Sequence, residues 1–319
     1  MSEGQILSRI LATLSPSQAI VGPGDDAAVL AMPDGRVVAT TDTLVHGPDF
    51  RLAWSSGFDL GWKSAAVNLS DIAAMGATPT ALLVALAMPE QTAMSFVEQF
   101  AAGLRAACES LAPGCAVEGG DLTVSDTLTV AVTALGTLDG QSPVLRSGAG
   151  VGDVVAIAGT LGAAGRGLAL LFDRFRDAEG FPCAIDFASL SETEAADMSA
   201  QLRPEPPVRL GRVAAAARAT AMMDVSDGLV LDASRIADAS GVSVSIQTSA
   251  LGVDAPNALT GGEDHALLAT FAHGSVLPEG FHAIGVIEAR GSAPVMVDGR
   301  AFTGRGGWDP YGDWDATRG

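Results

Sequence analysis

Residues 59–76 read Asp59-Leu-Gly-Trp-Lys63-Ser-Ala-Ala-Val67-Asn68-Leu-Ser-Asp71-Ile-Ala-Ala-Met75-Gly76. We predict one helix over residues 59–75, with Asp59 as its N-cap and Gly76 as the C′ residue that ends it. Lys63 lies eight residues before Asp71, which is two spacings of four residues. Asn68 lies three residues before Asp71. These polar side chains therefore share one face of an otherwise apolar helix.

The segments around this helix predict alternating strands and helices. In the first half we expect strands at 36–41, 81–87 and 127–136 and a second helix at 95–111. In the second half we expect strands at 153–158, 221–224 and 242–246 and helices at 168–172 and 229–239. A chain of 319 residues exceeds the usual size of one core, and a content of 48% hydrophobic residues can fill two. We therefore predict an α/β (α+β) protein with two domains, residues 1–145 and 146–319.

Aspartates recur at the ends of the apolar stretches. They are Asp25 and Asp26, Asp42, Asp71, Asp121, and Asp224 with Asp227. Carboxylates at strand ends are well placed to hold hard cations beside a polyphosphate, because Mg²⁺ takes one or two carboxylates together with phosphate oxygens and water. Each site alone also fits a turn, a hairpin or a helix cap. Their repetition favours a Mg-nucleotide site.

Composition excludes several classes of function. The net charge of −19 argues against a nucleic-acid partner, which needs a basic surface. Three cysteines without CxxC spacing indicate reduced thiols and no zinc site. The N-terminal segment lacks a signal-peptide pattern, and the longest uncharged run, residues 72–89, is broken by glycine and proline. We expect a cytoplasmic protein with no membrane partner.

Familiar catalytic motifs are missing from the sequence. Residues 57–64 resemble a P-loop, but Trp62 stands where glycine is required. The glycine-rich turn at 159–167 could offer backbone N–H groups to an anion, although its spacing matches no known phosphate motif. The four histidines are expected to be ordinary surface or hydrogen-bonded residues. Lys63 is the only lysine among 18 basic residues, and it either reaches a phosphate or carboxylate near its helix start or is a solvated cation.

Seven motifs in this order resemble the thiamine-monophosphate kinase family. They are Gly24-Asp25-Asp26-Ala27-Ala28, Thr41-Asp42-Thr43-Leu44-Val45, residues 66–77, Gly119-Gly120-Asp121, Arg146-Ser147-Gly148-Ala149, Asp224-Val225-Ser226-Asp227-Gly228-Leu229 and Gly261-Gly262-Glu263-Asp264. The resemblance implies the two-domain fold of the aminoimidazole ribonucleotide synthetase-like superfamily and a homodimer joined through the N-terminal sheets. It also implies ATP and several Mg²⁺ ions in the cleft, and phosphorylation of thiamine monophosphate to thiamine diphosphate.

The resemblance also implies roles for individual residues. The implied Mg²⁺ ligands are Asp26, Thr40, Thr41, Asp42, Asp71, Asp121, Asp224 and Asp227, of which Asp42, Asp71 and Asp121 carry the catalytic role. The implied ATP contacts are Gly120, Asp121, Arg146 and Ser226, and the implied substrate contacts are Asp49, Glu263 and Trp308. Because the attacking phosphate is already anionic, alignment and charge neutralisation suffice and no general base is needed.

Two departures from the family pattern fall on the substrate side. Asp49, in His46-Gly47-Pro48-Asp49-Phe50, replaces the usual histidine, and Trp308 is followed by Asp309-Pro310-Tyr311 in place of the usual ending. Asp49 could pair with a cationic thiazolium or could mark another substrate. Two alternatives therefore stay open: a superfamily relative that activates a different small substrate with ATP, and a Mg-nucleotide-binding protein without turnover.

Overall fold

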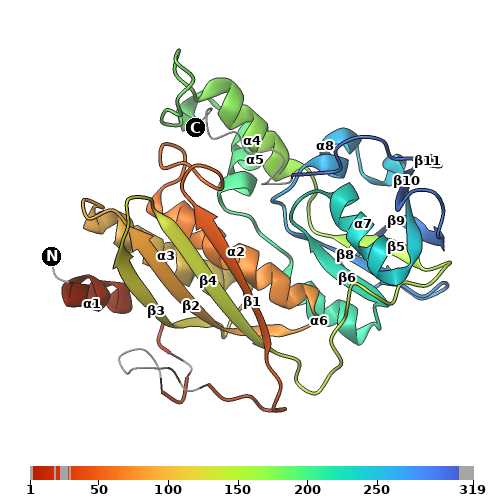
Figure 1. Ribbon diagram of the computed structural model, residues 1–319, viewed down its shortest axis with the longest axis horizontal. Helices are drawn as coiled ribbons and strands as arrows, with labels where there is room; N and C mark the ends of the chain where they lie inside the picture. The colour runs from red at the N-terminus through yellow and green to blue at the C-terminus, as the bar shows by residue number, and fades with distance from the viewer. Residues whose placement is uncertain (1–2, 18, 22–27, 29, 309–319) are drawn as a thin grey trace.

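The computed structural model describes residues 3–17, 19–21, 28 and 30–308. It contains two mixed β-sheets flanked by helices (Figure 1). The first part of the chain contains α1 (Glu3–Thr13), β1 (Val38–Val45), α2 (Gly57–Ala74), β2 (Thr78–Met88), α3 (Met94–Leu111), β3 (Ala116–Val124) and β4 (Thr129–Thr137). The second part contains β5 (Val154–Ala158), α4 (Ala163–Arg174), α5 (Glu192–Leu202), α6 (Val208–Ala216), β6 (Ala221–Val225), α7 (Leu229–Ser240), β7 (Val242–Ile246), α8 (Ala255–Thr260), β8 (Ala266–Phe271), β9 (His282–Ala289), β10 (Val295–Val297) and β11 (Arg300–Ala301).

The N-terminal sheet has the strand order β1-β4-β2-β3, and helices α2 and α3 cover one of its faces (Figure 1). Alternate residues of β1 and β4 face these helices, so Val130, Val132 and Ala134 are buried. The residues between them point to the other face, where Thr41 and Thr43 are exposed. A sheet with one covered face and one open face is what period-2 alternation produces.

Helix α2 is buried on nearly every side, because it contacts α3, the N-terminal sheet and the C-terminal domain. Its N-cap is Ser56 and not Asp59: the Ser56 side chain accepts from the Asp59 backbone N–H, and the Asp59 carboxylate accepts in return from the Ser56 N–H. The predicted N-cap was therefore wrong by three residues, since Asp59 supplies the second half of a capping box. Gly76 ends the helix with φ +72°, which confirms the predicted C′ glycine.

Helices α2 and α3 approach each other through glycines. A Cβ at Gly61 would collide with the Phe100 carbonyl oxygen, and one at Gly103 would collide with the Phe58 carbonyl oxygen. The close approach lets Leu60 and Phe100 join one hydrophobic core with the sheet. The two helices therefore pack as a single layer, in which α2 carries Lys63 and Asp71.

The C-terminal sheet has the order β11-β10-β7-β9-β5-β8-β6 and its own hydrophobic core beneath α7. A further apolar cluster joins the two parts of the chain: Ala74 of α2 packs there with Met222 of β6 and Leu267 of β8. Helices α4 and α5 form a hairpin that receives Trp54 from the β1–α2 loop. The expected two-domain fold is confirmed, and the boundary at residue 145 stays a prediction.

Two strand predictions were wrong in ways that matter for function. Strand β1 does not end before Asp42 but continues to Val45, so Asp42 lies in the middle of a strand. The Gly119-Gly120-Asp121 motif lies inside β3, which we did not predict and which pairs in parallel with β2. Glycines within a strand lower its apparent propensity, and this hid β3.

Among the described helices, none is long and apolar enough to cross a lipid bilayer.

The glycine contact between α2 and α3 gives a direct stability test. Gly61→Ala should lower the free energy of unfolding by about 2 kcal/mol, because the added methyl group has no space against the Phe100 carbonyl. Gly291→Ala is the control, since its Cβ would meet only the Ser243 hydroxyl at 3.8 Å. Urea denaturation should show a change within about 0.5 kcal/mol for the control. Equal stability of both variants would contradict the close approach of the helices.

Candidate functional site

Carboxylates from both domains meet beside α2. Asp42 comes from β1, Asp71 from the last turns of α2, and Asp224 from β6. Asp42, Asp71 and Asp224 lie close enough to act electrostatically on one another. The Thr40 hydroxyl donates to Asp71 Oδ2 at 2.7 Å. The structure therefore brings together four of the residues predicted as metal ligands.

Burial changes the acidity of these carboxyl groups. It raises the pKa of Asp71 to about 7, and the charges of Asp224 and Asp42 add to the rise while the Thr40 hydrogen bond opposes it. Burial also raises the pKa of Asp42; the charge of His265 opposes this rise and that of Asp224 adds to it. Neighbouring carboxylates removed from water favour a shared proton or a bound cation over full ionisation. The cluster is thus an attractive place for positive charge.

His265 supports the cluster from the C-terminal side. Its Nδ1 lies 3.0 Å from Asp224 Oδ2, and both side chains are buried. Burial alone would lower the pKa of His265, but the hydrogen bond and charge of Asp224 outweigh it and raise the pKa. The contact between the ring and Asp224 therefore fixes the orientation of both side chains. We had expected an ordinary histidine here, and nothing in the sequence links it to Asp224, which lies 41 residues away.

Other predicted ligands lie on the opposite face of the N-terminal sheet. Asp42 pairs with Val132 in the row that faces α2, whereas Asp121 pairs with Ala85 in the neighbouring row and points to the open face. Three strand spacings of about 4.8 Å also separate β1 from β3. Thr41 shares the open face, where its hydroxyl donates to the Val132 carbonyl at 2.9 Å. If Asp121 binds a cation, that cation is not the one beside Asp42 in the same chain.

Two further predicted ligands need separate mention. Asp227 forms an ion pair with Arg235 at 2.7 Å, and its backbone N–H donates to Asp232. Its carboxylate is therefore already neutralised by a cation of the chain. Asp26 lies outside the described residues. The roles predicted for Asp26, Thr41, Asp121 and Asp227 stay predictions.

The donor chemistry of the cluster fits a hydrated divalent cation. Within the described part of the chain, no three acidic, histidine or thiol side chains converge tightly enough to enclose a metal ion by themselves. Mg²⁺ does not require such a cage, because water and phosphate oxygens complete its coordination. Asp42 and Asp71, both raised in pKa by burial, are oxygen donors that a hard cation would neutralise. They fit a cation that arrives together with a phosphate.

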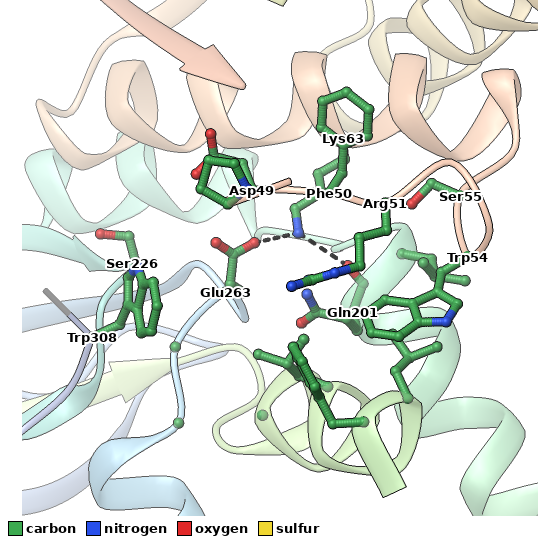
Figure 2. A pocket seen from close by; sticks show the side chains of 18 of the residues that line it. Asp49, Phe50, Arg51, Trp54, Ser55, Lys63, Gln201, Ser226, Glu263 and Trp308 are labelled. Atoms are coloured by element: carbon green, nitrogen blue, oxygen red, sulfur yellow. Dashed lines mark hydrogen bonds and ion pairs between the residues drawn. The ribbon is translucent and has the colours of Figure 1, made fainter. Parts of the chain in front are cut away.

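A cavity of about 650 Å³ lies next to this cluster, between the two domains. Ser226, two residues after Asp224, and Glu263, two residues before His265, line the cavity and connect it to the carboxylates. Figure 2 shows Asp49, Lys63, Glu263, Ser226 and Trp308 gathered at one end. The predicted substrate residues are therefore neighbours in space although they come from distant parts of the sequence.

The other end of the cavity is aromatic and basic. The Arg51 guanidinium lies 4.9 Å from the Trp54 ring centroid and 4.8 Å from that of Phe172, and the two rings contact each other edge to face at 5.1 Å, so Arg51 packs against an aromatic pair. Arg176 lies 5.7 Å from the Phe172 ring. Burial lowers the pKa of Arg51, and the nearby charge of Arg176 adds to this effect. Two cations that repel each other across an aromatic ring form a surface suited to an anion or a flat heterocycle.

Sequence analysis missed this basic and aromatic end. A signal was present in Phe172-Asp-Arg-Phe175-Arg176, where aromatic and basic residues alternate at the end of the predicted helix 168–172. Two predicted nucleotide contacts lie elsewhere: Gly120 is on the edge strand β3, and Arg146 is an exposed residue outside this cavity. Their roles stay predictions.

The glycine-rich turn before α4 already holds an anion of the chain itself. The backbone N–H groups of Gly162 and Ala164 donate to the Asp264 carboxylate at 2.6 Å and 2.9 Å. Gly162 has φ +79°, so its left-handed conformation aims these groups at Asp264. The turn is thus used to fix the segment that carries Glu263 and His265.

Comparison with known proteins places these features in a family. The family models for the N-terminal and C-terminal domains of AIR synthase related protein match residues 24–138 and 150–278. Thiamine-monophosphate kinase of Mycobacterium tuberculosis is 40% identical over 94% of this chain and 88% of its own, and that of Corynebacterium glutamicum is 38% identical over 90% and 88%.

Solved structures agree with the sequence relatives. The crystal structure of thiamine-monophosphate kinase from Stenotrophomonas maltophilia has a TM-score of 0.76 and 34% identity, and covers 94% of this chain and 96% of its own. The structure of AaThiL complexed with AMPPCP and TMP has a TM-score of 0.75 and 31% identity, and covers 95% and 94%. With both family models matched and relatives aligned over nearly its whole length, the chain belongs to the thiamine-monophosphate kinase family within the AIR synthase related proteins.

Proposed function

We propose that this chain transfers the γ-phosphoryl group of ATP to thiamine monophosphate and releases thiamine diphosphate and ADP. The observation that carries the proposal is the pairing of the Asp42, Asp71 and Asp224 cluster with the adjoining cavity. Support also comes from relatives named thiamine-monophosphate kinase and from a related structure that holds AMPPCP and TMP.

The chemistry of the reaction matches what these residues offer. The acceptor is a phosphate that is already anionic, so the site needs charge neutralisation and alignment and not a base. Mg²⁺, when bound by Asp42, Asp71 and Asp224, would neutralise the phosphates that are brought together. Thr40 and His265 keep Asp71 and Asp224 in fixed orientations through their hydrogen bonds. The partly buried position of the cluster limits access of water as a competing acceptor.

The cavity has the charge pattern of a zwitterionic heterocyclic substrate. Asp49 and Glu263 place negative charge at the end near the cluster, where a cationic thiazolium ring can lie. At the other end, the exposed ring of Phe172 offers a flat surface for a second ring. Asp49 is held by the Val45 backbone N–H, which donates to it at 2.7 Å. This arrangement favours thiamine phosphate even though Asp49 replaces the histidine usual in the family.

We also propose that two copies associate through the open face of the N-terminal sheet. Small and apolar side chains such as Leu83, Ala85 and Ala131 lie on this face, and none of the described helices covers it as α2 and α3 cover the other face. Analytical ultracentrifugation of the purified protein should give a dimer. A polar substitution on this face, Ala131→Glu, should yield monomers if the face is the interface, and an unchanged dimer would exclude it.

Product analysis tests the proposed reaction. Purified protein incubated with ATP, Mg²⁺ and thiamine monophosphate should form thiamine diphosphate and ADP in equal amounts, as measured by chromatography. Failure to form the diphosphate in a protein that still binds ATP would assign the cavity to a different acceptor. If the protein neither binds ATP nor forms the diphosphate, it is a member of the family without this activity.

Neutral variants test the carboxylate cluster. Asp42→Asn and Asp71→Asn should each lower kcat at least about 100-fold, because an amide cannot neutralise a cation beside a triphosphate. The same variants should fold and be more heat-stable than the parent without metal, since each removes a buried charge that repels its neighbours. Asp126→Asn, at an exposed site, is the matched control. Near-normal turnover in Asp71→Asn would contradict the assignment.

A further inference from the structure

Lys63 is the only lysine of the chain, and it is buried. It lies on α2, yet its side chain reaches the C-terminal domain: Nζ is 2.5 Å from Glu263 Oε2 and donates to the Gln201 carbonyl oxygen at 3.3 Å. In the amide orientation that satisfies both of its groups, Gln201 also accepts from Nζ at 3.3 Å and donates to the Ala164 carbonyl. The ammonium thus has one ion-pair partner, Glu263, and two hydrogen-bond acceptors on Gln201.

Glu263 presents two different sides. Its Oε2 oxygen, which faces Lys63, is covered, whereas 39% of the side-chain surface is exposed. Figure 2 shows the side chain at the edge of the cavity, between Lys63 and Ser226. Burial alone would raise the pKa of Glu263, but the charges of Lys63 and His265 outweigh it and lower the pKa. Lys63 therefore keeps Glu263 ionised and turned in one direction at the cavity wall.

The backbone around Glu263 is strained and needs such support. Glu263 has φ +72° and His265 has φ +54°, a conformation that residues with a side chain rarely adopt. Each residue of the segment 263–265 is tied to a different neighbour: Glu263 to Lys63, Asp264 to the turn before α4, and His265 to Asp224. Strained segments persist only where their surroundings hold them, and they concentrate at functional sites.

We propose that Lys63 is a positioning residue for phosphoryl transfer: by holding Glu263 it fixes the segment 263–265, and through His265 it fixes Asp224. One cation of the N-terminal domain then sets both the substrate wall and the carboxylate cluster of the other domain. This inference rests on the proposed function. It differs from two simpler roles for Lys63, a direct contact with substrate and a link that only joins the domains.

A double-mutant cycle separates these roles. The variants are Lys63→Met, Glu263→Gln and their combination, with KM for thiamine monophosphate, kcat and calorimetric binding of Mg-ADP as readouts. If Lys63 acts through Glu263, each single variant raises KM about tenfold and the double variant is no worse than either. Each single variant should also weaken Mg-ADP binding, because either change releases the segment that holds Asp224. The thermal midpoint of Lys63→Met should fall by roughly 5 °C or more, since Glu263 is left unpaired, and Glu263→Gln should restore part of it.

Arg203→Met is the control. Arg203 also links the domains, through Asp59 at 3.3 Å, but it has no contact with the segment 263–265 among the described interactions. It should leave KM and Mg-ADP binding unchanged. If the double variant instead raises KM by the product of the two single-variant factors, Lys63 contacts the substrate independently of Glu263. A fall in thermal midpoint with unchanged KM and unchanged Mg-ADP binding would reduce Lys63 to a link between domains. Either result overturns the proposal.

The cycle remains informative if the proposed reaction fails. Absence of thiamine diphosphate from the parent protein would disprove the proposed function. The thermal midpoints and Mg-ADP affinities of the same four proteins would still show whether Lys63 and Glu263 act together. Additive changes in both quantities would then disprove the positioning role separately.

Discussion

Carboxylates from two domains are held together in a partly buried cluster, and their mutual repulsion is the constraint on which the rest of the site depends. Burial and neighbouring charge raise the pKa of Asp71 to about 7. The folded protein accepts this arrangement because α2 is locked against α3 through glycines and against the C-terminal domain through an apolar cluster. Positive charge supplied from outside relieves the repulsion, and a cation bound with a phosphate is the form in which a phosphotransferase obtains it.

The segment 263–265 connects the carboxylate cluster to the cavity. Three consecutive side chains reach a lysine of the other domain, the turn before α4 and the carboxylate cluster. A substrate that alters Glu263 therefore acts on the same backbone that orients His265. Under the proposed function, these few contacts would couple binding of the acceptor to the orientation of the carboxylate cluster.

Sequence reasoning reached what local pattern determines. Hydrophobic periodicity and the glycines at element ends predict the helix that carries Asp71, its C′ residue Gly76 and the two-domain order. The order of the motifs along the sequence indicated the family. Sequence reasoning failed for features that depend on contacts between residues far apart in the sequence. Glycines hid β3, so the outward direction of Asp121 could not be seen, and the aromatic support of Arg51 joins residues more than 100 positions apart. Lys63 stood out only because it is alone; its partner Glu263 lies on another domain.

The proton balance of cation binding tests the account most directly. Because the pKa of Asp71 is raised to about 7, the folded metal-free protein holds a proton that the unfolded chain loses near pH 4, so its stability falls as pH rises between these values. Calorimetric titration of Mg²⁺ into the protein with AMPPCP, in buffers of different ionisation enthalpy, measures proton release. The account predicts that more protons are released on Mg²⁺ binding at one pH unit below the pKa of Asp71 than at one unit above it. In Asp71→Asn this difference in proton release should be lost. Equal release at both pH values in the parent protein would contradict it.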